Sequence, residues 1–335
     1  MLSKCNKITV LLLSRAAGKA HSIEELFATI ASAFSLYIQS KEYRAPFQRA
    51  RLRDIISNLI WTFRLPKYDV IHVTGDIHYA ILGLFRRRKI LTIHDLRFVD
   101  ESKGFRRWIL WLGWIVLPVW RADIVTVISE FTKTRLLSLC RVDPSKVKVV
   151  PNCVGKEFFP VTKSWPTENV RALLVGTTSN KNLERVMDAC FDLPLRFAIL
   201  GFLGTCQKAL MNDRNLDYEE YGGLSRDEVV NLYQACDLVI FVSTYEGFGM
   251  PILEAQAVGR PVITSDLSPM GDVAGEGALK VDPFDVDSIR SGVMSLMNDK
   301  HLREQLVHAG FQNVAGYSSE SVAELYAEIY RDVMN

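Results

Sequence analysis

No segment of this 335-residue sequence is apolar over the length that a membrane-spanning helix requires. The longest uncharged apolar stretch, residues 108–120, has 13 residues, whereas a helix that crosses a bilayer needs about 20. Near the N-terminus, Ile8–Leu13 is a short apolar run that Arg15 ends almost at once. A signal peptide normally carries a longer run. We therefore interpret Ile8–Leu13 as a buried strand and expect a cytoplasmic protein.

Paired cysteines and metal-binding patterns are also lacking. The six cysteines show no paired spacing, which suits a reducing cytoplasm better than disulfides or a metal site. Asp285 and Asp287 could suggest a metal site, but their position predicts the cap of a helix that starts near Ser288. Gly201–Gly204 is only half of a dinucleotide fingerprint, which argues against a dehydrogenase. We expect neither a metal nor a cofactor.

The net charge of +2 conceals an uneven distribution. Residues 1–150 contain 25 Lys and Arg against 12 Asp and Glu, a net charge of +13, and the remainder carries −11. A basic half indicates an anionic partner such as a membrane surface, a phosphorylated lipid or nucleic acid. The basic residues flank apolar patches and no nucleic-acid-binding module is recognisable, so we do not expect nucleic acid.

Short apolar runs alternate with amphipathic segments along the chain, a pattern typical of parallel sheets covered by helices. The apolar runs are rich in Leu and β-branched residues, as strands buried on both faces are. The expected strands are residues 8–14, 70–75, 89–95, 123–129, 171–176, 196–201, 238–243 and 261–265.

Three prolines between residues 151 and 166 mark a linker between two halves of this pattern. We expect an N-terminal Rossmann-like domain over residues 1–155, a linker over 156–169 and a C-terminal Rossmann-like domain over 170–316. Two doubly wound α/β domains of this kind would face each other across a cleft. Ligands would bind there, at the carboxyl ends of the strands.

The segment Tyr245–Ser265, YEGFGMPILEAQAVGRPVITS, combines a glycine-rich loop with a short helix. We predict Pro251 at the first helical position and Gly259 at a left-handed C-terminal cap. The first N–H groups of the helix, around Gly249 and Met250, would suit phosphate or sugar oxygens. By composition alone, a tight strand-to-helix turn with a glutamate on the surface fits equally well.

This segment resembles the signature of the family-4 retaining glycosyltransferases of the GT-B fold. Other segments match that family in order and spacing: SEFTKTRLL from Ser129, Val149–Val154, Leu173–Val186, Gly222–Ser243 and the N-domain histidine motif Thr92–Asp95. The resemblance implies a nucleotide-sugar donor, UDP- or GDP-linked, on the C-terminal domain. It implies a lipid-linked or glycan acceptor on the N-terminal domain and a last helix, 317–335, that crosses back to that domain.

The resemblance also assigns the donor site. It implies that Glu246 contacts the transferred sugar and that Glu254 binds the ribose hydroxyls. Lys181 follows a strand and a glycine turn, where a cation can stabilise the charge that the departing diphosphate gains. We expect His94, Lys181 and Glu246 to be catalytic. The expected donor-binding residues are Gly176, Thr177, Lys181, Gly247, Phe248, Gly249, Met250 and Glu254.

In the N-terminal half, the resemblance places His94 close to the donor sugar, with a satisfied core histidine as the alternative. His72 is better explained by packing. The loop after the first strand is usually a double glycine in the family, but here it contains only Gly18. The expected acceptor contacts are Arg15, Gly18, Lys19, His21 and Asp76.

Residues 103–121 contain four of the six tryptophans and have basic residues at both ends. Tryptophan beside arginine on an apolar stretch is typical of a helix at a membrane surface. An equally compatible interpretation is a buried helix that covers the N-domain sheet. The expected membrane contacts, at the inner face of the plasma membrane, are Arg106, Arg107, Trp108, Trp111 and Trp114.

We therefore expect a retaining, metal-independent hexosyltransferase that acts in the synthesis of a bacterial surface polysaccharide: O-antigen, capsule or exopolysaccharide. Two alternatives remain open. One is a nucleotide-sugar 2-epimerase on the same fold, although such enzymes lack the spaced glutamate pair. The other is a catalytically silent relative at the membrane surface.

Overall fold

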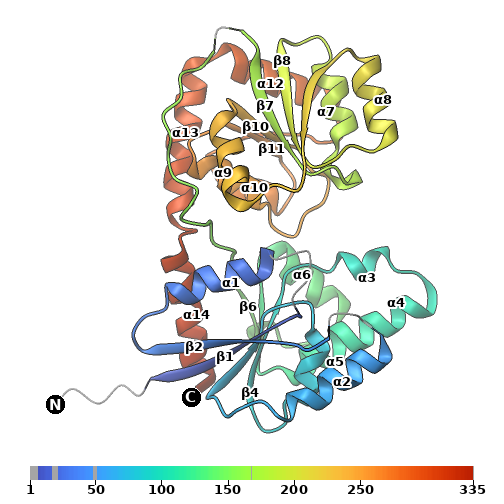
Figure 1. Ribbon diagram of the computed structural model, residues 1–335, viewed down its shortest axis with the longest axis vertical. Helices are drawn as coiled ribbons and strands as arrows, with labels where there is room; N and C mark the ends of the chain where they lie inside the picture. The colour runs from blue at the N-terminus through green and yellow to red at the C-terminus, as the bar shows by residue number, and fades with distance from the viewer. Residues whose placement is uncertain (1–6, 17–21, 48–50, 167, 335) are drawn as a thin grey trace, which may run out of the picture. The chain divides into compact units, whose positions relative to one another are not determined.

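The protein is described by a computed structural model that covers residues 7–16, 22–47, 51–166 and 168–334. The chain forms two compact units, residues 1–153 together with 319–335, and residues 154–318. Each unit contains a six-stranded parallel sheet with helices on its faces (Figure 1). The expected fold class, two doubly wound α/β units, is confirmed. None of the helices in the described ranges is both long and apolar enough to cross a membrane.

The N-terminal sheet has the strand order β2-β1-β3-β4-β5-β6. Its strands are β1 (Ile8–Ser14), β2 (Ile38–Arg44), β3 (Val70–Val73), β4 (Arg88–Ile93), β5 (Ile124–Val127) and β6 (Val147–Val149). The helices and helical turns of this unit are α1 (Ser22–Ser32), α2 (Leu52–Thr62), η1 (His78–Gly83), α3 (Arg97–Glu101), α4 (Gly104–Leu110), η2 (Trp111–Val116), α5 (Leu117–Arg121), α6 (Glu130–Leu139), η3 (Pro144–Lys146) and α14 (Ser319–Met334).

Alternate residues of β1 enter two separate cores, because successive side chains of a strand point to opposite faces. Val10 and Leu12 pack with α1 and α14, whereas Leu11 and Leu13 pack on the side of η1, η2 and α5. Figure 1 shows α1 and α14 on one side of this sheet and α2 and α5 on the other. The last helix of the chain is therefore part of the N-terminal unit's core.

The C-terminal sheet has the strand order β12-β11-β10-β7-β8-β9. Its strands are β7 (Val170–Val175), β8 (Leu195–Leu200), β9 (Asp217–Tyr221), β10 (Leu238–Phe241), β11 (Val262–Ser265) and β12 (Leu279–Val281). The helices are η4 (Ser179–Lys181), α7 (Leu183–Cys190), α8 (Thr205–Asp213), α9 (Arg226–Ala235), α10 (Met250–Ala257), α11 (Met270–Ala274), α12 (Val286–Asn298) and α13 (Lys300–Ala315). All eight strands expected from the sequence are present.

Three of the described histidines in the N-terminal unit are buried: His72, His78 and His94. His72 joins the sheet to α14, with Nδ1 2.9 Å from the Tyr330 hydroxyl and Nε2 2.6 Å from Thr92 Oγ1. Burial lowers the pKa of His72 to about 3 and also lowers the pKa values of His78 and His94. All three imidazoles are therefore neutral at pH 7, and His72 is a packing residue, as predicted.

We expect the N-terminal unit to lose stability as the pH falls below the ordinary histidine pKa of about 6.5. The unfolded chain takes up protons that the buried imidazoles reject, so unfolding becomes more favourable. Between pH 7.5 and 5.5, His72 alone should lower the free energy of unfolding by about 1.4 kcal/mol. Urea titrations followed by tryptophan fluorescence would measure this, because five of the six tryptophans belong to this unit.

A His72→Gln variant provides the control for this prediction. It should be less stable at pH 7.5 but show a shallower dependence on pH, because one buried imidazole is gone. A free energy of unfolding that is constant or rises between pH 7.5 and 5.5 would contradict the neutral, buried state of these histidines.

Candidate functional site

The loop that leaves β10 turns directly into helix α10. Gly249 caps this helix with a φ of +113°, a left-handed conformation that a side chain would strain. Pro251 is the second helical residue, so its predicted place at the first position was wrong by one residue. The second N–H is likewise unbonded within the helix, so proline is tolerated there too. Gly259 has a φ of +76° after the helix, which confirms the predicted left-handed cap.

Glu246 lies in this loop and forms an ion pair with Lys181. Lys181 Nζ is 2.7 Å from Glu246 Oε1. Asn180 donates from Nδ2 to the same carboxylate oxygen at 3.2 Å and to the Tyr245 carbonyl at 2.9 Å. The Lys181 ammonium also lies 4.5 Å from the centroid of the Phe241 ring. Cation and carboxylate are thus held beyond the carboxyl ends of β7 and β10, which are neighbouring strands.

Special backbone conformations shape the turn that carries Lys181. Gly176 follows β7 with a φ of +85°, and a Cβ atom there would lie 2.8 Å from the Lys181 side chain. Asn182 is left-handed, and its side-chain amide donates to two backbone carbonyls. The Thr177 carbonyl accepts a hydrogen bond from Gln207 at 3.1 Å. The lysine therefore stands on a fixed turn rather than on a free loop.

Glu254 lies one turn into α10 and is nearly buried, with 7% of its surface exposed. The Tyr233 hydroxyl donates to its Oε2 at 2.7 Å, and Arg226 donates to its Oε1 at 3.2 Å. Burial raises the pKa of Glu254, while Arg226 and Tyr233 act in the opposite direction. A cation and a hydroxyl hold this carboxylate, and neither of them contacts Glu246.

Three further predicted donor residues, Gly247, Phe248 and Met250, lie between the two glutamates in the sequence. Phe248 is buried, and its ring meets Tyr317 edge-on with 6.0 Å between the ring centroids. Gly247 precedes it, and Met250 is the first residue of α10. The structure thus brings Lys181 into contact with Glu246 and gives Glu254 different partners, while the donor roles of these residues stay predictions.

In the N-terminal unit, His94 directly follows β4 and is largely buried. Its Nε2 donates to the Thr74 carbonyl at 2.9 Å. A carbonyl only accepts, so the proton of the neutral imidazole is on Nε2 and Nδ1 carries a lone pair. The Phe27 and His94 rings pack in a T-shaped arrangement with 6.1 Å between centroids. His94 can therefore serve as a fixed hydrogen-bond acceptor.

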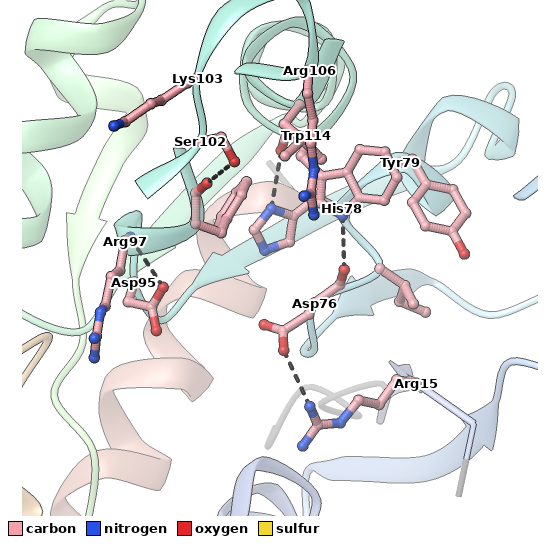
Figure 2. A pocket seen from close by; sticks show the side chains of 13 residues that line it. Arg15, Asp76, His78, Tyr79, Asp95, Arg97, Ser102, Lys103, Arg106 and Trp114 are labelled. Carbon is pink, nitrogen blue, oxygen red and sulfur yellow. Dashed lines mark hydrogen bonds and ion pairs between the residues drawn. The ribbon is translucent and has the colours of Figure 1, made fainter. Parts of the chain in front are cut away.

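A pocket of about 1160 Å³ opens in the N-terminal unit beside the predicted acceptor residues Arg15 and Asp76 (Figure 2). Arg15 Nη1 is 3.2 Å from Asp76 Oδ2, and Arg15 Nε is 2.8 Å from Glu24 Oε1. The other predicted acceptor residues, Gly18, Lys19 and His21, lie outside the described residues. Among the residues that line the pocket, sequence reasoning missed the basic side chains of His78, Arg97 and Lys103.

The tryptophan-rich segment divides into a packed part and an exposed part. Trp111 and Trp114 pack against the core, and their indole N–H groups donate to the carbonyls of Leu139 and Asp76. The apolar face of η2 thus turns toward the sheet, and a membrane contact of these two partly buried residues stays a prediction. Trp108, by contrast, is 53% exposed, and Arg106 and Arg107 on the same helix are exposed.

Among the described residues, no group of three or more His, Cys, Asp or Glu side chains could hold a metal ion. Asp285 accepts a hydrogen bond from the Asp287 amide at 2.9 Å and caps α12, which begins at Val286. The predicted capping role is confirmed, with the helix starting two residues earlier than expected.

Two family models match the chain. "Glycosyl transferases group 1" matches residues 156–313, and "Glycosyltransferase Family 4" matches residues 4–158. The O-antigen chain mannosyltransferase B of Escherichia coli is 25% identical over an alignment of 231 positions that covers 63% of this chain. The match spans only 61% of that relative's length. The D-inositol 3-phosphate glycosyltransferase of Corynebacterium urealyticum is 32% identical over 316 residues, covering 79% of this chain and 72% of the relative.

Among solved structures, the Anabaena protein HepE in complex with UDP and glucose matches with a TM-score of 0.79 at 15% identity. The match covers 97% of this chain and all of HepE. At this identity the likeness supports the fold, which is GT-B. Since the two family models and a relative of 32% identity agree, the chain belongs to the glycosyl transferases of group 1.

Proposed function

We propose that this glycosyltransferase moves a hexose from a UDP- or GDP-sugar to a lipid-linked or glycan acceptor during synthesis of a bacterial surface polysaccharide. The observation that carries the proposal is the contact between Lys181 and Glu246 next to the start of α10. It supplies a cation for the leaving diphosphate and a carboxylate for sugar hydroxyls in one place. A relative that acts on the O-antigen chain and a HepE structure with bound UDP support the donor and the pathway class.

In the proposed reaction, the acceptor hydroxyl attacks the anomeric carbon from the face on which the diphosphate leaves, so the configuration is retained. The bond from the sugar to the phosphate oxygen breaks, and that oxygen takes the acceptor proton. An ammonium has three N–H donors, so Lys181 can keep Glu246 and still bind a phosphate oxygen. Together with the first amides of α10 it compensates the leaving charge, so the reaction needs no metal bound to the protein.

The two carboxylates have different tasks in this proposal. Glu246 orients the sugar through its hydroxyls, and the catalytic role of His94 stays a prediction. Glu254, held by Tyr233 and Arg226, accepts hydrogen bonds from the ribose. Each carboxylate oxygen has a second lone pair, so one protein partner per oxygen leaves room for a ribose hydroxyl.

The donor site can be tested with UDP- and GDP-hexoses. We expect either the UDP or the GDP compounds to raise the melting temperature of the protein, and the corresponding nucleotide-hexose to be cleaved with release of nucleoside diphosphate.

Lys181→Met should lower turnover by about 10²- to 10³-fold, and Glu254→Gln should weaken nucleotide binding by about tenfold or more. Lys208→Met is the matched control, because Lys208 also pairs with a glutamate at 2.7 Å but on the surface of α8.

Each result has a clear counterpart. Unchanged turnover in both variants would refute the site assignment. Interconversion of the sugar without release of nucleoside diphosphate would favour the epimerase alternative, and no reaction with any donor would favour the silent relative.

We also propose that the N-terminal unit contacts anionic lipid through the exposed face of α4. Phe105 and Trp108 are 75% and 53% exposed, and their rings stack with 6.1 Å between centroids. Arg107 is exposed on the same short helix. Exposed aromatic rings beside arginine suit the interface of an anionic bilayer.

Cosedimentation with vesicles tests this contact. Phe105→Ser/Trp108→Ser should bind vesicles of phosphatidylglycerol and phosphatidylcholine several-fold more weakly than the unchanged protein. Phe202→Ser provides the control, because Phe202 is 68% exposed in the other unit. Equal binding of the double variant and the control would exclude α4 as the contact.

A further inference from the structure

The pocket in the N-terminal unit has two chemically different ends (Figure 2). Asp76 and Asp95 line one end, the acidic end, whereas Lys103 and Arg106 line the other. At the acidic end, Asp76 pairs with Arg15, and Arg97 lies beside Asp95. A ligand that fills this pocket therefore meets carboxylates with arginines beside them on one side, and cations without carboxylates on the other.

His78 lies in the wall of this pocket with 1% of its surface exposed. Its Nδ1 is 3.0 Å from the Trp114 carbonyl, which can only accept, so Nδ1 carries the proton. Burial lowers the pKa of His78, so the ring is neutral and Nε2 keeps a bare lone pair. Nε2 has no hydrogen-bond partner, and in Figure 2 it points away from Trp114 toward the acidic end. Unpaired buried acceptors are rare in proteins, and a ligand that donates a hydrogen bond would satisfy this one.

The basic end also has unused hydrogen-bonding capacity. Lys103 and Arg106 are exposed at the start of α4. Within the described residues, neither side chain has a carboxylate or other hydrogen-bond partner, in contrast to Arg15. Two cations without carboxylate partners at one pocket rim attract an anionic group, and arginine and lysine are the residues that bind phosphate and carboxylate.

We infer that this pocket binds the sugar acceptor as a polyhydroxylated group that carries an anionic substituent. A hydroxyl of the acceptor donates to His78 Nε2, and its phosphate or carboxylate lies against Lys103 and Arg106. The inference rests on the proposed function, because it names the chemical class of the acceptor in that reaction. It adds His78, Lys103 and Arg106 to the residues that select the acceptor.

Binding of three small probes to the full chain tests the inference: glucose 6-phosphate, glucuronate and methyl glucoside, each measured by calorimetry at millimolar concentration. The two anionic probes should bind more tightly than methyl glucoside. If only glucose 6-phosphate does so, the substituent is a phosphate, and if only glucuronate does so, it is a carboxylate. The double variant Lys103→Gln/Arg106→Gln should lower by about tenfold the affinity for the anionic probe that binds and leave the affinity for methyl glucoside unchanged.

Two further variants separate the pocket from general effects. Arg107→Gln removes a neighbouring exposed cation that does not line the pocket, so it should leave all three affinities unchanged. His78→Asn places an amide N–H near the former Nδ1, which keeps the bond to Trp114 while removing the Nε2 acceptor. It should lower the affinity for all three probes by a similar factor, because each probe offers a hydroxyl to this acceptor.

Equal affinity for charged and neutral probes, no binding of any probe, or equal weakening by Arg107→Gln would overturn the inference. Release of nucleoside diphosphate from the donor, measured on the same preparations, tests the proposed function separately from the inference about the acceptor pocket. If the protein cleaves the donor but the pocket variants leave probe binding unchanged, only the inference about the acceptor is overturned. Pocket-dependent probe binding without donor cleavage would refute only the proposed function.

Discussion

The contact between Lys181 and Glu246 depends on the pairing of two parallel strands. Because β7 and β10 are neighbours and run in the same direction, the loops that leave them meet at one edge of the C-terminal sheet. Two asparagines join these loops: the Asn180 carbonyl accepts from the Thr244 amide at 2.8 Å, and Asn182 donates to the Val242 carbonyl at 3.1 Å. A cation and a carboxylate thus sit close together with most of their conformational freedom already removed. Such preorganisation is what stabilises charge that develops during a reaction.

The same loop gives its two glutamates different electrostatic surroundings. Glu246 keeps 17% of its side chain exposed and faces an ammonium, whereas Glu254 is inside the unit with a phenol and a guanidinium. The left-handed turn at Gly249 makes this separation possible, because the chain changes direction between the two carboxylates. A glycosidase acid and base would face a single bond from both sides. Here the arrangement instead suits two ligands, or two parts of one ligand.

The sequence predicted the buried strands far better than the polar ones. The eight expected strands are apolar and lie within the sheets, while the strands that were not anticipated include β2 and β9, IQSKEYR and DYEEY. These are edge strands, and their polar composition removes the apolar signal on which the prediction depended. The spacing of Trp111 and Trp114 fits both a membrane face and a core face. Only the path of η2 over the sheet shows that both rings pack against the core.

The properties that could not be predicted concern unpaired atoms rather than residue types. His78 differs from His72 and His94 in that one buried ring nitrogen has no partner, and this depends on where Trp114 presents its carbonyl. No periodicity or motif encodes that distance, because the two residues are 36 positions apart. The excess of basic charge in residues 1–150 gave a coarser hint of an anionic partner. The structure divides that excess between cations with carboxylate partners, such as Arg15, and cations without them, such as Lys103 and Arg106. The second kind has all of its hydrogen-bond donors available to an anionic ligand.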